Sequence, residues 1–294
     1  MNTSATPSRP ARIAKYYDEA PGRVDADGTR HWATRGANFT VVATQAVAGT
    51  VLSRENNPDE YMLLLPENVG ATLEADGATV ETPGDSLSIF PPGVSRVTVT
   101  TPGWVYRIFS NRATDLLDWT SNRDDYIERA DVAPLEAWPE PVGGYKLRHY
   151  PLANYVRQEN SMRLFRSTNL MINIFLPQTK PRDPKKMTPH SHADFEQGSL
   201  SLSGSYVHHL RYPWTPDLNA WREDEHALVF SPSLCIMTTK VVHTSQAIGT
   251  ERTRLVDIFS PPRIDFSLKP GLVNNADEYP MPETAEAAPA AKAA

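Results

Sequence analysis

Residues 187–197, MTPHSHADFEQ, contain two histidines separated by one residue and followed by a carboxylate and an amide side chain. Residues i and i+2 of a strand face the same side, so His190 and His192 can point together into one barrel. Their imidazole nitrogens could reach a divalent ion at ~2.0–2.1 Å. His243, in the later stretch TTKVVH, could add a third nitrogen and leave coordination positions open for water or substrate. The pattern predicts a metal site; the alternative is a polar strand edge.

Other residues could bind or transform a substrate beside such an ion. His208 and His209 are adjacent in YVHHLRYPW, so only one of them can face the inside of a barrel, where it could act as an acid or base. Bidentate hydrogen bonds to a substrate carboxylate are expected from arginines. The candidates are Arg163, Arg166 and Arg211, with surface ion pairs as the alternative.

The elements that must position these residues are strands. Short runs such as NFTVVATQAV, DSLSIFPPG, NLMINIFLPQ and TRLVDIFSP alternate with Gly, Pro, Asn and Asp. This spacing is typical of an antiparallel sandwich or barrel. The stretch NRATDLLDWTSNRDDYIERADVAPLEAW breaks the pattern and predicts a short helix followed by a linker. We therefore expect an all-β protein with two domains joined by a partly helical connector.

The two halves have an internal repeat. In the first half Arg54 and Asn56 stand at the spacing of the two histidines, Glu60 follows four residues later, and Arg96 stands where the second half has His243. Arginine has no lone pair to give a metal. The first half is therefore expected to keep its barrel without a metal site, and both arginines are expected to pair with Glu60.

At these residues the chain resembles the cupins, specifically the two-domain bicupins. Their first motif reads here as His190-Ser-His192, ADFE, Gln197, GSLSLS and Gly204, without the leading glycine. Their second motif is matched by GDSLSIFPPGVSR in the first half, apart from its arginine, whereas the second half keeps the histidine and lacks Pro-x-Gly. The resemblance spans residues 35–265. It implies two tandem double-stranded β-helix (jelly-roll) barrels, of which the N-terminal one is degenerate.

The resemblance leaves two residues as possible fourth ligands. Glu196 fits a three-residue gap after His192, whereas Gln197 fits a four-residue gap and also lies at the motif's distance from Gly204. We favour Gln197. A neutral amide makes the ion a stronger Lewis acid and favours an anionic substrate, and it leaves Glu196 free to act as a base or to orient a ligand.

A second short resemblance concerns residues 257–266, DIFSPPRIDF. They are similar to the closing strand of single-domain cupins of the uronate-converting, ring-opening type, which use three histidines and a glutamine. This similarity favours chemistry on a small oxygenated anion.

These expectations give domain boundaries. Residues 1–30 are expected to form a flexible arm, residues 31–140 the N-terminal barrel without a metal site plus the helical linker, residues 141–280 the C-terminal barrel with the metal site, and residues 281–294 a disordered tail. The ends of the chain are rich in Pro, Ala, Ser and Thr, which bury little apolar surface.

Composition excludes several classes of partner. The net charge of −6 and the lack of a basic stripe argue against nucleic acid. No apolar run approaches ~18 residues and the N-terminus has no apolar core, so we expect no membrane span, no secretory signal and a cytoplasmic location. The single cysteine, Cys235, lies in the apolar stretch SLCIM and is expected to be buried and inert.

The predicted function is that of a metal-dependent enzyme acting on a small organic acid, sugar acid or dicarbonyl compound. Its cofactor would be one divalent transition metal ion (Fe, Mn, Ni or Zn). The reaction would be of the isomerase or lyase type through an enolate or, with Fe(II), that of a dioxygenase. The rival is a non-catalytic protein that binds a small molecule. Exposed sheet edges make a homodimer the default expectation.

Overall fold

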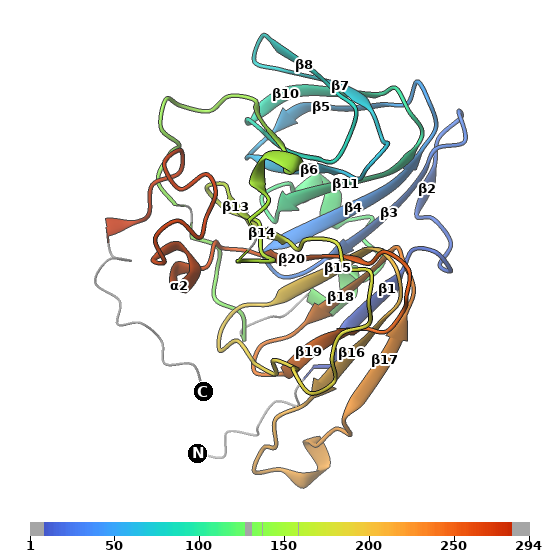
Figure 1. The fold of residues 1–294 in the computed structure, drawn as a ribbon, viewed down its shortest axis with the longest axis vertical. Coiled ribbons are helices and arrows are strands. Elements are labelled where there is room, and N and C mark those ends of the chain that lie inside the picture. Colours follow the sequence, from blue (N-terminus) through green and yellow to red (C-terminus); the bar gives the residue numbers. More distant parts are fainter. Residues whose placement is uncertain (1–8, 127–130, 137, 158, 284–294) are drawn as a thin grey trace.

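The computed structural model describes residues 9–126, 131–136, 138–157 and 159–283 (Figure 1). The first eight residues of the expected arm and residues 284–294 of the expected tail lie outside this part of the chain. The regular secondary structure of the described residues is mainly β-strand, arranged as two barrels in tandem, and this confirms the predicted fold class. Within the described ranges, no helix is both long enough and apolar enough to cross a membrane.

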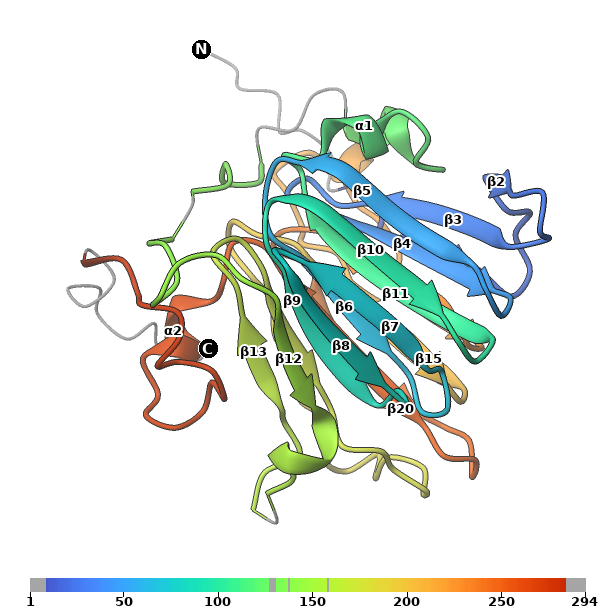
Figure 2. The ribbon, with the colours of Figure 1, turned by 90° about the horizontal axis from the view of Figure 1, so that it is seen from above.

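The N-terminal barrel is built from a seven-stranded and a four-stranded sheet. The strand orders are β12-β9-β6-β11-β4-β3-β2 and β5-β10-β7-β8. Figure 2 shows the smaller sheet beside β9, β6 and β11. The strands are β2 (Arg23–Val24), β3 (Arg30–Arg35), β4 (Phe39–Ala46), β5 (Val51–Asn57), β6 (Tyr61–Leu65), β7 (Ala71–Ala75), β8 (Ala78–Thr82), β9 (Ser86–Phe90), β10 (Gly93–Val99), β11 (Gly103–Ser110) and β12 (Arg148–Pro151).

The C-terminal barrel is built from a six-stranded and a three-stranded sheet. The orders are β1-β18-β15-β20-β14-β13 and β17-β16-β19. The strands are β1 (Arg12–Lys15), β13 (Leu164–Arg166), β14 (Met171–Ile174), β15 (Gln197–Ser203), β16 (Tyr206–Arg211), β17 (Glu225–Val229), β18 (Ser233–Met237), β19 (Val242–Ala247) and β20 (Arg254–Phe259). The short helices are α1 (Thr114–Leu117) and α2 (Ile264–Ser267), and the 3-10 turns are η1 (Arg123–Tyr126), η2 (Leu152–Tyr155) and η3 (Leu218–Ala220).

The two barrels exchange edge strands, which differs from the expected boundaries. Residues 12–15 lie in the segment expected to be a flexible arm, yet β1 pairs with β18 of the C-terminal barrel. In the other direction, β12 follows the expected boundary at residue 140 and pairs with β9 of the N-terminal barrel. Each exchange covers a sheet edge that would otherwise expose unpaired backbone groups. A four-residue strand is too short to show a period in the sequence.

A single hydrophobic core joins the halves. The large sheets of the two barrels lie next to each other as layers (Figure 1), and apolar side chains on their facing sides form one buried cluster. Members from the N-terminal sheet are Val41, Ala43, Met62, Leu64, Leu87, Tyr106 and Ile108, and members from the C-terminal sheet are Ala14, Ile172, Leu200, Leu234, Ile236, Val256 and Ile258. The alternate residues of these strands face the two barrel interiors.

Candidate metal centre

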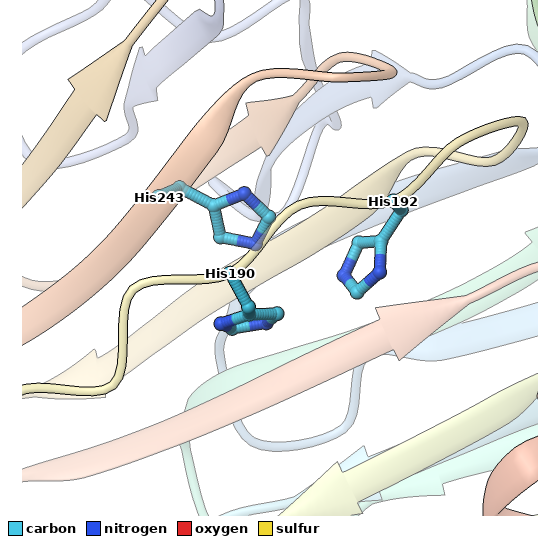
Figure 3. A group of neighbouring side chains, drawn as sticks. All are labelled: His190, His192 and His243. Atoms are coloured by element: carbon cyan, nitrogen blue, oxygen red, sulfur yellow. The ribbon is translucent and has the colours of Figure 1, made fainter. Parts of the chain in front are cut away.

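Three histidines of the C-terminal barrel converge on one point (Figure 3). Their candidate ligand atoms all lie within 4.8 Å of one another, and they are the one such group of three or more His, Cys, Asp or Glu side chains among the described residues. His243 belongs to β19, and His190 is bridged to it by two backbone hydrogen bonds of 3.1 and 2.8 Å. His192 follows in a loop, so the expected strand is here only an isolated bridge at His190.

Backbone carbonyls fix the orientation of two of the rings. The Nδ1 of His190 lies 2.9 Å from the carbonyl oxygen of Thr188, and the Nδ1 of His243 lies 2.9 Å from that of Val241. A carbonyl only accepts, so both Nδ1 atoms carry the proton and both Nε2 atoms keep a lone pair. Metal-binding histidines are commonly held in this way by their second nitrogen.

Gln197, the first residue of β15, turns its side chain toward the histidines. Its Oε1 lies 3.0 Å from Nε2 of His192 and 3.4 Å from Nε2 of His243. Two atoms bound to one ion at ~2.0–2.2 Å are roughly 3 Å apart, so these separations suit a ligand set. The amide nitrogen of Gln197 donates to Ser199 at 3.2 Å, and Ser199 donates to Asp257 at 2.6 Å.

Glu196 lies outside this group. Its Oε2 accepts a hydrogen bond from the backbone N–H of Ala37 at 2.7 Å, and its Oε1 accepts one from the hydroxyl of Tyr126 at 3.1 Å. Successive residues entering a strand point to opposite faces, and Gln197 occupies the inner one. The expectation of Glu196 as a base beside the histidines is therefore corrected: its carboxylate contacts the N-terminal half.

The electrostatic environment keeps His192 and His243 neutral. Burial lowers the pKa of His192 to about 3 and that of His243 to about 4, and the positive charge of Arg263 acts in the same direction on both pKa values. The guanidinium of Arg263 lies 3.7 Å from the ring centroid of Phe266 and pairs with Asp265 at 2.6 Å. We did not predict a role for Arg263, although it lies in DIFSPPRIDF, the stretch that resembles a cupin closing strand.

The interior next to the histidines is polar. Cross-strand pairing places Ser199 beside Asp257 and Ser201 beside Ser233, on the face that also carries Gln197. Burial raises the pKa of Asp257 to about 6. Among the described residues, the buried side-chain atoms of this barrel without a hydrogen-bond partner include Asn173 Oδ1, Ser201 Oγ, His208 Nε2 and Ser233 Oγ. Such atoms indicate contact with water or a polar ligand.

The interior of the N-terminal barrel is mainly apolar by contrast. Tyr61 stacks between Phe90 and Phe109 at 4.7 and 4.8 Å between ring centroids. Around them pack Val42, Leu52, Leu63, Leu65, Leu73, Val97, Val99 and Val105.

The adjacent histidines of β16 face opposite sides of their sheet. His208 is buried, its Nδ1 lies 2.8 Å from the hydroxyl of Ser245, and burial lowers its pKa to about 4. His209 lies on the outer face, where its Nδ1 is 2.8 Å from Nδ1 of His226. Only His208 therefore shares the interior with the histidine group.

The three candidate arginines contact other groups. The guanidinium of Arg163 donates to the backbone carbonyls of Leu152, Ile174 and Phe175. That of Arg166 donates to the carbonyl of Tyr279 and lies over the ring of Trp138. Arg211 is exposed and pairs with Asp224 at 2.6 Å. The prediction that these residues clamp a substrate is corrected, because their donors are directed to backbone carbonyls or to the surface.

The first half differs from its expected pairing as well. Arg54 pairs with Asp115 at 2.7 Å, not with Glu60, and Arg96 is exposed. Across the strands Arg54 faces Ser95, because a register irregularity between Gly93 and Ser95 shifts the pairing of β10 with β5.

Ser95, not Arg96, is therefore the counterpart of His243. His190 faces His243 across its bridge, as Arg54 faces Ser95. A shift of one residue moves a side chain to the other face of a strand.

Glu60 and Glu196 have equivalent roles. Glu60 accepts hydrogen bonds from the backbone N–H of Thr168 at 3.1 Å and from the hydroxyl of Tyr279 at 2.8 Å. Glu196 accepts the same pair of bonds, from Ala37 and Tyr126. Each carboxylate thus reaches the opposite half of the chain. Ala37 and Thr168 lie in the similar stretches RGANF and RSTNL. This similarity is the feature of the sequence that could have indicated these reciprocal hydrogen bonds.

Cys235 is buried within the C-terminal barrel, which confirms the predicted burial. Burial raises the pKa of its thiol, so the thiol stays protonated at neutral pH.

Solved structures with this architecture include two oxalate decarboxylases. That of Lactobacillus farciminis, in a formate complex, gives a TM-score of 0.58 at 12% identity over 90% of this chain and 88% of the other. A variant of the Bacillus subtilis enzyme gives 0.57 at 12% identity over 99% and 89%. AerE from Microcystis aeruginosa gives 0.51 at 9% identity over 83% and 98%. The chain therefore has the bicupin fold, and at these identities the likeness concerns the fold alone.

No protein-family model matches the chain, and no curated protein matches its sequence.

Proposed function

We propose that this protein is a metal-dependent enzyme that acts on a small oxygenated organic anion in its C-terminal barrel. The observation that carries the proposal is the convergence of three histidines and one glutamine at the edge of a polar interior. The ligands would be His190, His192, His243 and Gln197, and the ion would be one of Fe, Mn, Ni or Zn.

The residues fit such an ion. His190 and His243 each present a lone pair on Nε2, and the Gln197 carbonyl oxygen lies between two imidazole nitrogens. When bound, the ion would act as a Lewis acid toward an oxygen of the substrate. All four ligands would be neutral, so a bound ion would keep its full positive charge and would attract a negatively charged substrate.

Proton transfer is assigned to His208. Burial keeps its ring neutral, Ser245 holds it through Nδ1, and its Nε2 has no partner among the described residues. A neutral imidazole with a lone pair on Nε2 can accept a substrate proton and return it. This assignment replaces Glu196, which is directed to the other half of the chain.

The proposal covers two classes of reaction. Isomerase or lyase chemistry through an enolate and, with Fe(II), dioxygenase chemistry both fit the ligand set. The structural neighbours named as oxalate decarboxylases act on a small dicarboxylate, which supports the same class of substrate for this chain. The second candidate is a non-catalytic binding protein, favoured by the position of Glu196 outside the site.

The test of the metal site is elemental analysis of three purified proteins. We expect about one transition-metal ion per chain in the wild type, almost none in His192→Ala, and an unchanged content in the double variant Arg54→Ala/Asn56→Ala. The matched double variant controls for general loss of stability, because it changes the equivalent positions of the other barrel. Equal loss of metal in both variants, or no metal in the wild type after reconstitution, contradicts the proposal.

The enzyme and the binding protein are separated by turnover. The metal-loaded protein is incubated with oxalate and with other small organic acids while carbon dioxide release and oxygen consumption are followed. We expect turnover of at least one acid, reduced on the order of 10²-fold or more in His208→Gln at unchanged metal content. Binding of an acid without turnover favours the second candidate.

A further inference from the structure

The N-terminal barrel contains a buried cation. Arg107 lies in the middle of β11, where its strand partners are Val42 on β4 and Leu63 on β6. These three residues share the inner face of the barrel, and Arg107 is only 7% exposed. Its guanidinium carbon lies 5.7 Å from the ring centroid of Phe109.

No described carboxylate forms an ion pair with Arg107. Besides burial, the side chains that act on the pKa of Arg107 are Tyr61, Arg54, Arg23 and Asp25, and Asp25 is the one carboxylate among them. Arg54 is already paired with Asp115 at 2.7 Å, and Arg23 with Asp25 at 3.0 Å. Arg107 itself forms no ion pair with any described residue, and its Nε has no hydrogen-bond partner among them. A buried guanidinium without an anionic partner is unfavourable.

A second buried polar group without a partner lies close to it. Thr40 is completely buried, and no described residue bonds to its Oγ1. Thr40 pairs with Phe109 across β4 and β11, which makes it the diagonal neighbour of Arg107 on the same face. Diagonal neighbours in a sheet lie within reach of a long side chain.

We propose that the N-terminal barrel binds a small carboxylate anion between Arg107 and Thr40, without a metal. A guanidinium presents paired N–H donors that match the two oxygens of a carboxylate, and the threonine hydroxyl can donate to one of them. The neighbouring Val42, Leu63 and Phe109 make the surroundings apolar, which strengthens an ion pair. The N-terminal barrel is then a second anion site.

The experiment is isothermal titration of the full chain with formate, oxalate and chloride at matched ionic strength. The proteins are the wild type, Arg107→Met, Thr40→Val and His192→Ala. Methionine keeps the length of the arginine side chain and removes its charge. Valine has nearly the shape of threonine, so Thr40→Val still tests the proposal if Arg107→Met does not fold. His192→Ala separates this site from the proposed metal centre, so the two proposals fail independently.

We expect formate or oxalate to bind the wild type and His192→Ala alike. The affinity should fall at least about tenfold in Arg107→Met and about threefold in Thr40→Val. Equal binding by the wild type and Arg107→Met overturns the proposal, as does loss of binding in His192→Ala, which assigns the anion to the other barrel. Chloride binding as tightly as the carboxylates, or no heat with any of the three salts, overturns it as well.

Discussion

Gln197 and Glu196 are neighbours in the chain, but their side chains serve different parts of the molecule. Gln197 faces the histidines, and Glu196 bonds to the backbone of Ala37 in the other half. We therefore expect Gln197→Ala to weaken metal affinity at least about tenfold, because it removes the proposed oxygen ligand. A chelator competition titration measures this loss.

Glu196→Gln is the matched control for that substitution. It should leave the metal affinity within about twofold and lower the free energy of unfolding by about 1–3 kcal/mol, since one buried hydrogen bond is lost. The opposite pattern, with metal lost in Glu196→Gln and kept in Gln197→Ala, would assign the fourth ligand to the glutamate.

His208 links the interior to the pH dependence of stability. Its pKa is about 4 in the folded chain and about 6.5 in an unfolded one, so the folded state binds fewer protons between these values. Stability is therefore complete above pH ~6.5 and falls as the pH drops toward ~4, by at most about 1.4 kcal/mol per pH unit for this one group. His192 and His243 contribute in the same direction.

His208→Gln should accordingly reduce the acid-induced fall in Tm. Thermal unfolding measured from pH 7 to pH 4 checks this expectation, with His226→Gln on the exposed face of the neighbouring strand as the control. Identical pH profiles for the wild type and His208→Gln would contradict the expectation, because they would mean that the pKa of this ring is the same in the folded and the unfolded chain.

At the scale of elements, β1 shows how four residues can complete a sheet. Ala14 is fully buried in the core between the large sheets, whereas Lys15, one residue later, is partly exposed. We expect Ala14→Glu to lower the free energy of unfolding by more than about 3 kcal/mol, because it buries an unpaired charge. Lys15→Glu, with the same new side chain, should cost less than about 1 kcal/mol.

Urea denaturation measures both changes. Similar small losses in the two variants would mean that β1 detaches from β18 at little cost.

At the scale of the whole molecule, the halves depend on each other. The central core takes side chains from both large sheets, the edge strands are exchanged, and Glu60 and Glu196 each bond to the opposite half. Neither half can unfold without exposing apolar surface of the other. We therefore predict one cooperative unfolding transition for the full chain.

Glu60→Ala tests this coupling. It leaves the Thr168 N–H and the Tyr279 hydroxyl buried without their acceptor, so it should cost about 3 kcal/mol or more and lower the single Tm by roughly 2–4 °C per kcal/mol. Calorimetry should still show one peak, and the exposed Glu81→Ala serves as the control. Two separate peaks would contradict the coupling.

The sequence by itself was sufficient for the fold class and for the residues that converge at the candidate site. Strand periodicity follows from the alternation of side chains, so runs such as NLMINIFLPQ predicted strands without knowledge of their partners. The spacing of His190 and His192, together with His243, predicted the group that the structure brings together. These features depend only on the spacing of residues along the chain, which can be read directly from the sequence.

Only the tertiary structure decided which residues share an interior. The choice between Gln197 and Glu196, the inward direction of His208, the backbone partners of Arg163 and the pairing of Ser95 with Arg54 all depend on register and on which strands are neighbours. A shift of one residue in the pairing register moves every side chain of a strand to the other face of the sheet. The register cannot be read from the sequence of one strand alone. The exchange of β1 and β12 likewise arises from contacts between residues more than fifty positions apart, which local pattern does not contain.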